Sequence, residues 1–137
     1  MNGYLLDTNV VSEIRKRDRA NPNVLDWFSA LDSDQLFVSV LVVGELRQGI
    51  ESVRRRDKIS ARRLDRWLAQ LRTHYEERVL PVTEPIAELW GKLSVVGPFP
   101  VVDGLMAATA KFHHLTLATR NTKDVRDSGA DLFNPFE

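Results

Sequence analysis

The chain begins with a short apolar run, Tyr4-Leu5-Leu6, which stops abruptly at the polar triplet Asp7-Thr8-Asn9. A run this short, followed by a segment with helical spacing, predicts a buried parallel strand that leads into a helix. In open α/β sheets, ligands bind just outside the carboxyl ends of the strands. The sequence therefore places Asp7 at a ligand-binding edge, and we interpret it as the first of several carboxylates gathered around a divalent metal.

The composition sets bounds on the class of protein. The 137 residues, 43% of them hydrophobic, predict a single domain over residues 1–137 with a substantial core. The absence of cysteine excludes disulfides and thiolate metal sites. No apolar run approaches the ~20 residues of a membrane span, and no signal-peptide pattern begins the sequence, so we expect a cytoplasmic protein without a membrane partner. Serine-triad, P-loop and dinucleotide motifs are absent from the sequence.

After the first strand, short apolar runs alternate with segments of helical periodicity. Further strands are predicted at residues 36–38, 78–82, 115–118 and 132–133, the last at an edge of the sheet. Helices are predicted at residues 10–14, 22–31, 40–53, 60–75, 85–93 and 103–112. Asn21 before Pro22 is typical of a helix start, and Ser39 is a second candidate cap. Strands separated by helices predict an α/β fold whose central sheet is mostly parallel and covered on both faces.

Carboxylates and an amide fall at equivalent places in this arrangement. Asp7 follows the first strand, Glu45 lies in the helix after the second, and Asp103 opens the sixth helix. The loop after the fourth strand adds Asn121 and Asp124. Carboxylates that converge repel one another and need either protons or a cation between them. Oxygen ligands without His or Cys suit Mg²⁺ or Mn²⁺, and such ions support phosphodiester hydrolysis.

Each of these residues also has an ordinary structural interpretation. Asp7 and Asp103 are both suitable helix N-caps, and Asp103 could also complement the helix dipole. Glu45 could be a solvated residue on a surface helix, although its apolar neighbours favour partial burial. Asp124 could be a common loop aspartate and Asn121 a turn former. Three capping residues in a row, at Asp7-Thr8-Asn9, exceed what one cap requires, which favours a functional role there.

The charge is balanced overall but unevenly distributed. Nineteen basic and nineteen acidic residues give a net charge of zero. Residues 54–66 hold seven basic residues against two acidic ones, a local charge of +5. A basic segment beside an acidic body is one pattern for an enzyme that acts on a polyanion. It is equally typical of a solvated, arginine-rich helical hairpin.

Four segments together resemble the PIN-domain ribonucleases, and most closely the VapC and FitB toxins of bacterial type II toxin–antitoxin modules. The segments are Leu5-Leu6-Asp7-Thr8-Asn9-Val10-Val11-Ser12-Glu13, Val43-Gly44-Glu45-Leu46-Arg47-Gln48-Gly49, Val102-Asp103-Gly104-Leu105-Met106-Ala107-Ala108-Thr109-Ala110 and Leu117-Ala118-Thr119-Arg120-Asn121-Thr122. The resemblance implies a PIN-like α/β/α sandwich with a mostly parallel sheet of four or five short strands. It also implies Mg²⁺- or Mn²⁺-dependent RNA cleavage, a homodimer, and an inhibitory antitoxin protein with a DNA-binding domain.

The resemblance also assigns roles to individual residues. Asp7, Glu45 and Asp103 match the three acidic positions of the family, where they would be catalytic and hold the metal. Thr8 and Asn9 match the polar residues that support the first aspartate.

The fourth acidic position differs among relatives. Some have an acid at the place of Asn121, and others have one where Asp124 stands. We expect Asp124 to act as the fourth catalytic and metal-binding residue, and Asn121 to position Asp7 or a water.

The sequence thus predicts an endoribonuclease toxin acting on RNA, with tRNA and rRNA as candidate substrates. The basic segment supplies candidate contacts to the RNA backbone, at Arg54, Arg55, Arg62 and Arg66. The same segment could instead be structural or contact the antitoxin. Two alternatives remain open: a nuclease of the same fold acting on an rRNA precursor or on DNA, and a non-catalytic interaction module.

Overall fold

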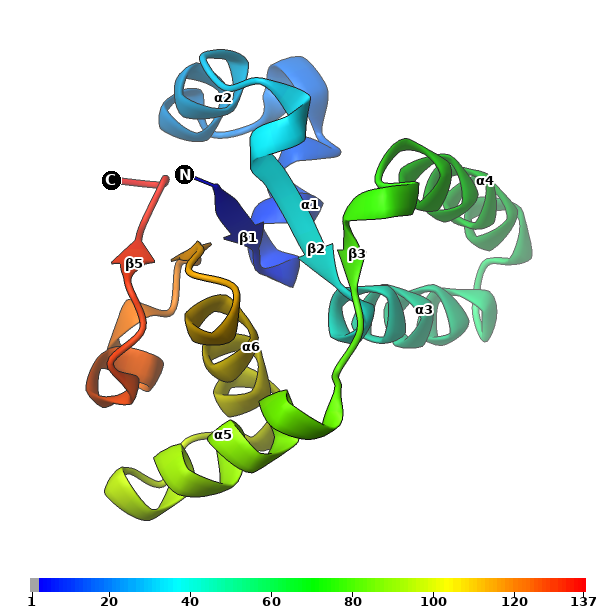
Figure 1. Cartoon of the computed structure of the whole chain (residues 1–137). Helices are drawn as coiled ribbons and strands as arrows, with labels where there is room; N and C mark the ends of the chain where they lie inside the picture. The colour runs from blue at the N-terminus through cyan, green and yellow to red at the C-terminus, as the bar shows by residue number, and fades with distance from the viewer. Residues whose placement is uncertain (1–2) are drawn as a thin grey trace.

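The computed structural model describes residues 3–137, which form a central parallel sheet flanked by helices (Figure 1). The five strands lie in the order β3-β2-β1-β4-β5. The strands are β1 (Tyr4–Leu6), β2 (Leu36–Ser39), β3 (Val79–Leu80), β4 (Thr116–Ala118) and β5 (Leu132–Phe133). The helices are α1 (Thr8–Ile14), α2 (Pro22–Ser29), α3 (Val40–Arg54), α4 (Lys58–His74), α5 (Glu84–Val96) and α6 (Val101–Phe112). The predicted α/β/α sandwich is confirmed.

Strand β1 is the centre of the sheet. It pairs in parallel with β2 and with β4, in registers that place Tyr4 opposite Leu36 and Leu6 opposite Ala118. Leu5 and Leu6 are completely buried, as expected for a central strand covered on both faces. The N–H of Asp7 donates to the Ala118 carbonyl at 3.0 Å and extends the β1–β4 ladder by one residue. Asp7 therefore lies at the carboxyl edge of the sheet.

Two helical hairpins border this edge. Figure 1 shows α3–α4 on the right and α5–α6 at the lower left, with the carboxyl ends of β1 and β2 pointing between them. The main core joins the sheet to α1, α3, α4 and α6, and a smaller core, around Ile86, Leu93 and Ala108, joins α5 to α6. Within residues 3–137, no single helix is long and apolar enough to span a membrane, although the bent α5–α6 pair satisfies both criteria together.

The predicted helix starts are partly confirmed. Asn21 caps α2 by accepting from the Asn23 N–H at 2.8 Å, and Ser39 caps α3 by accepting from the Leu41 N–H at 3.0 Å. The prediction that Ser60 opens the fourth helix is wrong, because Asp57 is the cap and accepts from the Ser60 N–H at 3.0 Å.

Other element boundaries differ from the prediction as well. Helix α6 begins at Val101, two residues before Asp103, because Pro100 supplies the extended cap position. Strand β3 is limited to Val79–Leu80, since residues 76–78 form a 3-10 turn and Pro81 has no N–H for a ladder. The predicted loop after β4 contains a 3-10 helix over Thr122–Ser128. Shorter 3-10 turns also occupy Arg17–Arg19 and Ser33–Gln35.

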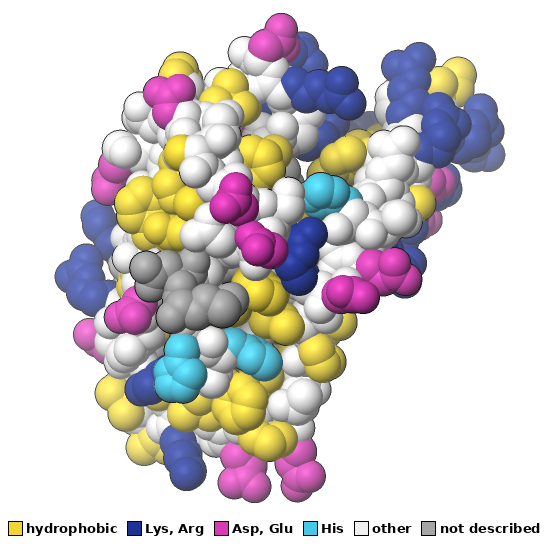
Figure 2. Space-filling model, turned by 45° about the horizontal axis from the view of Figure 1, so that its top comes forward, with side chains coloured by type: hydrophobic (Ala, Val, Ile, Leu, Met, Phe, Trp, Pro, Cys, Tyr) yellow, Lys and Arg dark blue, Asp and Glu magenta, His cyan; other side chains and the backbone are white. Residues whose placement is uncertain are grey.

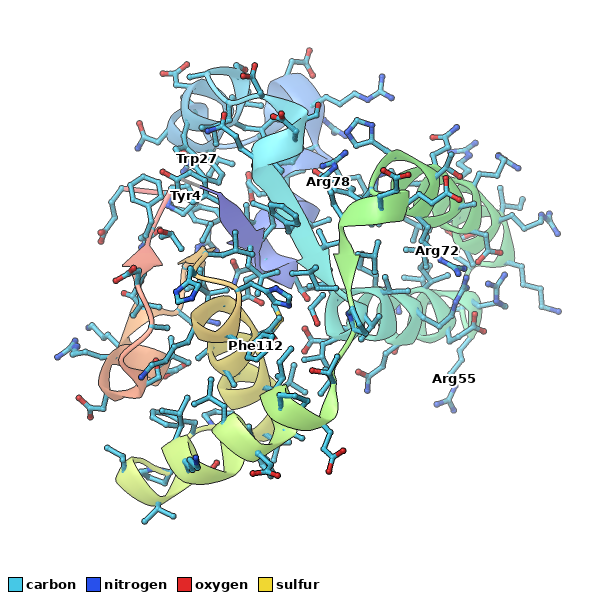
Figure 3. All side chains as sticks on the ribbon, in the orientation of Figure 1. Tyr4, Trp27, Arg55, Arg72, Arg78 and Phe112 are labelled. Carbon is cyan, nitrogen blue, oxygen red and sulfur yellow. The ribbon has the colours of Figure 1, made fainter. Side chains whose placement is uncertain are left out.

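Arg78 connects the end of α4 to the start of β2 (Figure 3). Its guanidinium donates to the carbonyls of Ser33, Leu36 (2.6 Å) and His74 (2.9 Å). The same group lies over the Tyr75 ring, 4.9 Å from its centroid. One side chain thus satisfies carbonyls from three elements: the 3-10 turn Ser33–Gln35, β2 and α4.

We expect Arg78→Ala to lower the free energy of unfolding by about 2 kcal/mol, because charged hydrogen bonds to carbonyls are lost. Urea unfolding followed by circular dichroism measures the change. Arg72→Ala, in the last turn of α4, is the matched control, since Arg72 is exposed and has no hydrogen-bond or ion-pair partner within residues 3–137. Equal effects of the two substitutions would show that Arg78 does not make this connection.

Candidate active site

An open cleft of about 540 Å³ lies at the carboxyl edge of the sheet, between α3 and α6. Its lining residues come from the end of β1, the start of α1, the middle of α3, the first turn of α6 and the loop after β4. They are Asp7, Thr8, Asn9, Glu45, Gln48, Gly49, Ser52, Asp103 and Asn121. The structure therefore brings together six residues that the sequence predicted for the site, namely Asp7, Thr8, Asn9, Glu45, Asp103 and Asn121.

Asp7 is only 7% exposed, and hydrogen-bond donors surround its carboxylate. One oxygen accepts from the Thr8 N–H at 2.8 Å. The other accepts from the Thr119 hydroxyl at 2.7 Å and from the Asn9 amide at 3.2 Å. Asp7 is also the N-cap of α1, so the capping interpretation is correct. Capping uses one carboxylate oxygen, and the residue still lines the cleft.

Glu45 is partly buried rather than solvated, which answers the alternative raised by the sequence. Its carboxylate accepts from the Thr8 hydroxyl at 2.6 Å. Thr8 thereby connects the first turn of α1 to the middle of α3. The Ser39 cap fixes where α3 begins, and this start places Glu45 one and a half turns later, facing Asp7 across the cleft.

Asp103 is the third residue of α6 and therefore is not its N-cap. Within residues 3–137 its carboxylate has neither a hydrogen-bond donor nor an ion-pair partner. Burial raises its pKa, and the negative charges of Asp7, Asp124 and Glu45 raise it further. The charges of the other three carboxylates therefore act on Asp103, which has no compensating partner among the described residues.

A close approach of α5 to α6 sets the position of Asp103. A Cβ atom at Gly104 would lie 3.1 Å from atoms of the Trp90 ring and 3.3 Å from the Phe99 Cβ. Such contacts are tighter than ordinary van der Waals separations. Glycine at this position lets Trp90 pack directly on the α6 backbone beside Asp103.

The two candidates for the fourth position differ in location. Asn121 lines the cleft, and its N–H donates to the Thr119 hydroxyl at 3.0 Å. Asp124 is exposed on the following 3-10 helix and does not line the cleft. Its charge nevertheless acts on the pKa of Asp103. In the described part of the chain, no three His, Asp or Glu side chains are arranged to hold one ion directly.

Thr119 belongs to the site but has no role in the sequence-based prediction. It is 1% exposed, and its hydroxyl donates to Asp7 while accepting from the N–H of Asn121. The available signal is the sheet register: Leu6 pairs with Ala118, so the residues that follow each strand become neighbours. Finding Thr119 from sequence therefore requires knowing that these two strands are adjacent.

The basic segment is divided between paired and unpaired residues. Arg54 donates to Asp65 at 2.7 Å and to Glu51 at 3.0 Å, and Arg47 also pairs with Asp65 at 2.8 Å. Hydrogen bonds from Arg54, and then from Arg47, lower the pKa of Asp65 to about 2. The network joins α3 to α4. The remaining predicted RNA contacts are exposed and form no ion pair within residues 3–137: Arg55, Arg62 and Arg66. In the space-filling view, basic side chains gather at the upper right (Figure 2). Figure 3 labels Arg55 just after the end of α3.

Comparison with known proteins shows the family to which this chain belongs. The family model described as the PIN domain matches residues 4–127, and the chain belongs to this family. The chain is 32% identical to Toxin FitB of Neisseria gonorrhoeae, over 96% of this chain and 97% of that one. It is 34% identical to VapC ribonuclease Y4jK of Sinorhizobium fredii, over 97% of both chains. The crystal structure of FitAcB from Neisseria gonorrhoeae superposes with a TM-score of 0.90 at 32% identity, covering 98% and 99% of the two chains. The resemblance stated from the sequence is confirmed.

Asp103→Asn tests the crowding of charge in the cleft. The raised pKa means that the folded state disfavours the charged form, so ionised Asp103 destabilises the fold at pH values above that pKa. We expect the metal-free variant to melt about 2–4 °C higher at pH 7, the shift that roughly 0.5–1 kcal/mol produces in a domain of this size. The gain should disappear as the pH falls and the parent carboxyl becomes protonated.

Differential scanning calorimetry from pH 3.5 to pH 7.5 measures this dependence. Asp26→Asn, at an exposed position on α2, is the matched control and should leave the melting temperature unchanged. A lower melting temperature for Asp103→Asn at pH 7 would contradict the interpretation.

Proposed function

We propose that this protein is a metal-dependent endoribonuclease and the toxin of a type II toxin–antitoxin system. The observation that carries the proposal is the cleft in which Asp7, Glu45 and Asp103 converge with no cation among its described lining residues. Membership of the PIN family and similarity to proteins named VapC ribonuclease and Toxin FitB support it.

The residues present fit a divalent metal. The donors are carboxylate oxygens with no sulfur or imidazole among the lining residues, a set that suits Mg²⁺ or Mn²⁺. Asp7, Glu45 and Asp103 would hold the ion either directly or through its bound waters, and Asp124 would act from outside the cleft. Mg²⁺ usually keeps several waters and is bound through one or two carboxylates, which agrees with a cleft where no three described side chains hold one ion directly. When bound, the ion would supply an activated water and neutralise charge on the phosphate.

The neighbouring side chains have a positioning role. Thr119 and Asn9 fix the orientation of the Asp7 carboxylate, and Thr8 fixes that of Glu45. Each donor is itself held by the fold, since Asn9 also accepts from the N–H of Arg120 at 3.2 Å. Asn121 extends this network to the loop after β4 through Thr119. The carboxylates are thus oriented before substrate arrives, which is what a cleft built for phosphodiester hydrolysis requires.

A protein partner is part of the proposal. An apolar groove of about 360 Å³ lies between α1, α2 and α4, with arginines at its rim. It is lined by Leu6, Val11, Ile14, Arg15, Arg17, Leu25, Phe28, Trp67, Leu71 and Tyr75. We propose that a segment of the antitoxin occupies this groove, while the rest of that protein carries a DNA-binding domain. Similarity to the solved structures described as FitAcB and as FitAB bound to a DNA fragment supports a protein partner and a link to DNA, and the choice of this groove rests on its apolar lining.

A second copy of the chain is also expected. The end of α5 and the start of α6 present exposed apolar side chains at Val95, Val96 and Val101. Such a patch suits a homodimer contact. A free toxin of this kind would damage its host, so we expect cytoplasmic activity to be held in check by the antitoxin complex.

Asp7→Asn tests the metal site. We expect it to reduce RNA cleavage about 100-fold or more, because residues that only support a metal ligand already contribute about 10- to 100-fold. The fold should survive, since Asn caps a helix as well as Asp does. Cleavage of a mixed RNA substrate with Mg²⁺, Mn²⁺ or excess chelator provides the measurement, with Asp26→Asn as the control. Full activity of Asp7→Asn, or of the parent in chelator, would refute the proposal.

Leu25→Glu tests the antitoxin groove. We expect it to weaken binding of the protein encoded by the adjacent gene by about 30-fold or more, since it places a charge in an apolar contact. RNA cleavage by the purified variant should be retained, because the groove is separate from the acidic cleft. Calorimetric titration gives the affinity, and co-expression reports relief of growth arrest. Unchanged affinity would assign the antitoxin to another surface, and Asp26→Asn again serves as the control.

A further inference from the structure

The acidic cleft lacks the positive charge that a polyanion requires. Among the described residues that line it, none is Lys or Arg. A metal can compensate for the phosphate at the scissile bond, but a strand of RNA brings further phosphates on both sides. Phosphate contacts from Lys and Arg supply much of the affinity of proteins for nucleic acid. These contacts must therefore come from the rim of the cleft.

Arg120 occupies the rim next to the first carboxylate. It lies between Thr119 and Asn121, both of which belong to the site. Its N–H donates to the Asn9 side-chain oxygen at 3.2 Å, and the Asn9 amide donates to Asp7 at 3.2 Å. A single side chain therefore links the Arg120 backbone to the Asp7 carboxylate. Arg120 is exposed to solvent.

The guanidinium of Arg120 is held in place by an aromatic ring. Its central carbon lies 3.8 Å from the centroid of the Phe136 ring. Phe136 is itself fixed, since its N–H donates to the Asn134 side chain at 2.9 Å and its carbonyl accepts from the Asn23 amide at 3.0 Å. The ring contacts the guanidinium, and none of the guanidinium N–H groups donates a hydrogen bond to another of the residues 3–137. The N–H edge of a guanidinium matches the geometry of a phosphate.

No carboxylate neutralises this charge. Arg120 forms no ion pair in the part of the chain that the structure describes. Its charge acts on Glu13, whose pKa is lowered mainly by a hydrogen bond from Lys16 and by the Asn21 N–H, with a smaller effect from Arg120. The Glu13 oxygens are taken by these two donors, at 2.9 and 2.8 Å. Arg120 is therefore a preorganised cation with free donors.

We propose that Arg120, stacked on Phe136, binds the RNA phosphate next to the scissile bond. The inference rests on the proposed ribonuclease function and adds a contact outside the acidic cleft. Because a backbone phosphate is present at every nucleotide, the contact would raise affinity without selecting a base. Glutamine at this position would keep a polar side chain of related shape up to Cδ, and would lose both the charge and the planar fork.

The test measures RNA binding with cleavage suppressed. Asp103→Asn is the background, since Asp103 does not take part in the Asp7–Asn9–Arg120 connection. Binding of a fluorescent single-stranded RNA is followed by anisotropy in Mg²⁺ across 25–200 mM KCl. We expect Arg120→Gln to weaken binding about threefold to tenfold at low salt and to reduce the slope of log affinity against log salt by about 0.7.

Two further variants separate charge from position. Phe136→Leu keeps the charge but removes its platform, so the affinity should fall about twofold to threefold while the salt slope stays unchanged. Arg72→Gln, on α4 next to the β3 edge of the sheet, is the charge-matched control and should change neither quantity. In the cleavage-competent parent, Arg120→Gln should raise KM and leave kcat close to the parent value.

The outcomes distinguish this inference from the proposed function. If the parent cleaves RNA and Arg120→Gln has the parent's KM and salt slope, the Arg120 contact is refuted while the ribonuclease assignment stands. If Arg120→Gln weakens only the antitoxin, the residue belongs to the protein interface and the inference is also refuted. Loss of thermal stability with unchanged RNA binding would assign Arg120 and Phe136 a purely structural role. A parent that cleaves no RNA refutes the proposed function itself.

Discussion

Repulsion between carboxylates at one edge of the sheet is the constraint on which the rest of this structure depends. The register of β1 with β4 and the start of α3 bring acidic side chains together. These side chains differ in the hydrogen-bond donors that surround them. Asp7 is stabilised by donors from its own helix and from Thr119, and Glu45 by the hydroxyl of Thr8. Asp103 has no such donor in residues 3–137, and its pKa rises accordingly. None of the described residues that line the cleft is Lys or Arg, so no cationic side chain among them offsets this repulsion.

Local features of the sequence were sufficient to predict the elements that carry these acids. The apolar run before Asp7, the Ser39 cap and the helical spacing after it depend on neighbours within a few residues, and the structure confirms them. Features that depend on partners far along the chain could not be predicted in this way. Thr119 reaches Asp7 only because two distant strands are adjacent, and Arg54 is engaged by Asp65 only because α3 and α4 pack together.

The errors in element boundaries have a common origin. Sequence patterns indicate where apolar periodicity begins, whereas hydrogen bonds decide where a helix begins. The Asp57 side chain accepts from the Ser60 N–H, so α4 begins before the predicted Ser60. The Pro100 carbonyl accepts from the Gly104 N–H, so α6 begins before the predicted Asp103. For Asp103 the difference matters, because a residue two positions inside a helix no longer caps it. Its carboxylate is then directed into the cleft without an internal partner.

The hydrogen bond between Thr119 and Asp7 joins residues 112 positions apart. The central strand β1 pairs with β4, which is encoded near the other end of the chain. During synthesis, β1 and α1 leave the ribosome long before β4 exists, and contacts this distant in sequence form late. The Asp7 carboxylate therefore reaches its final orientation only after most of the polypeptide has been made. The carboxyl edge of the sheet, where the acidic cleft lies, is therefore completed only after β4 and the loop that follows it have been synthesised.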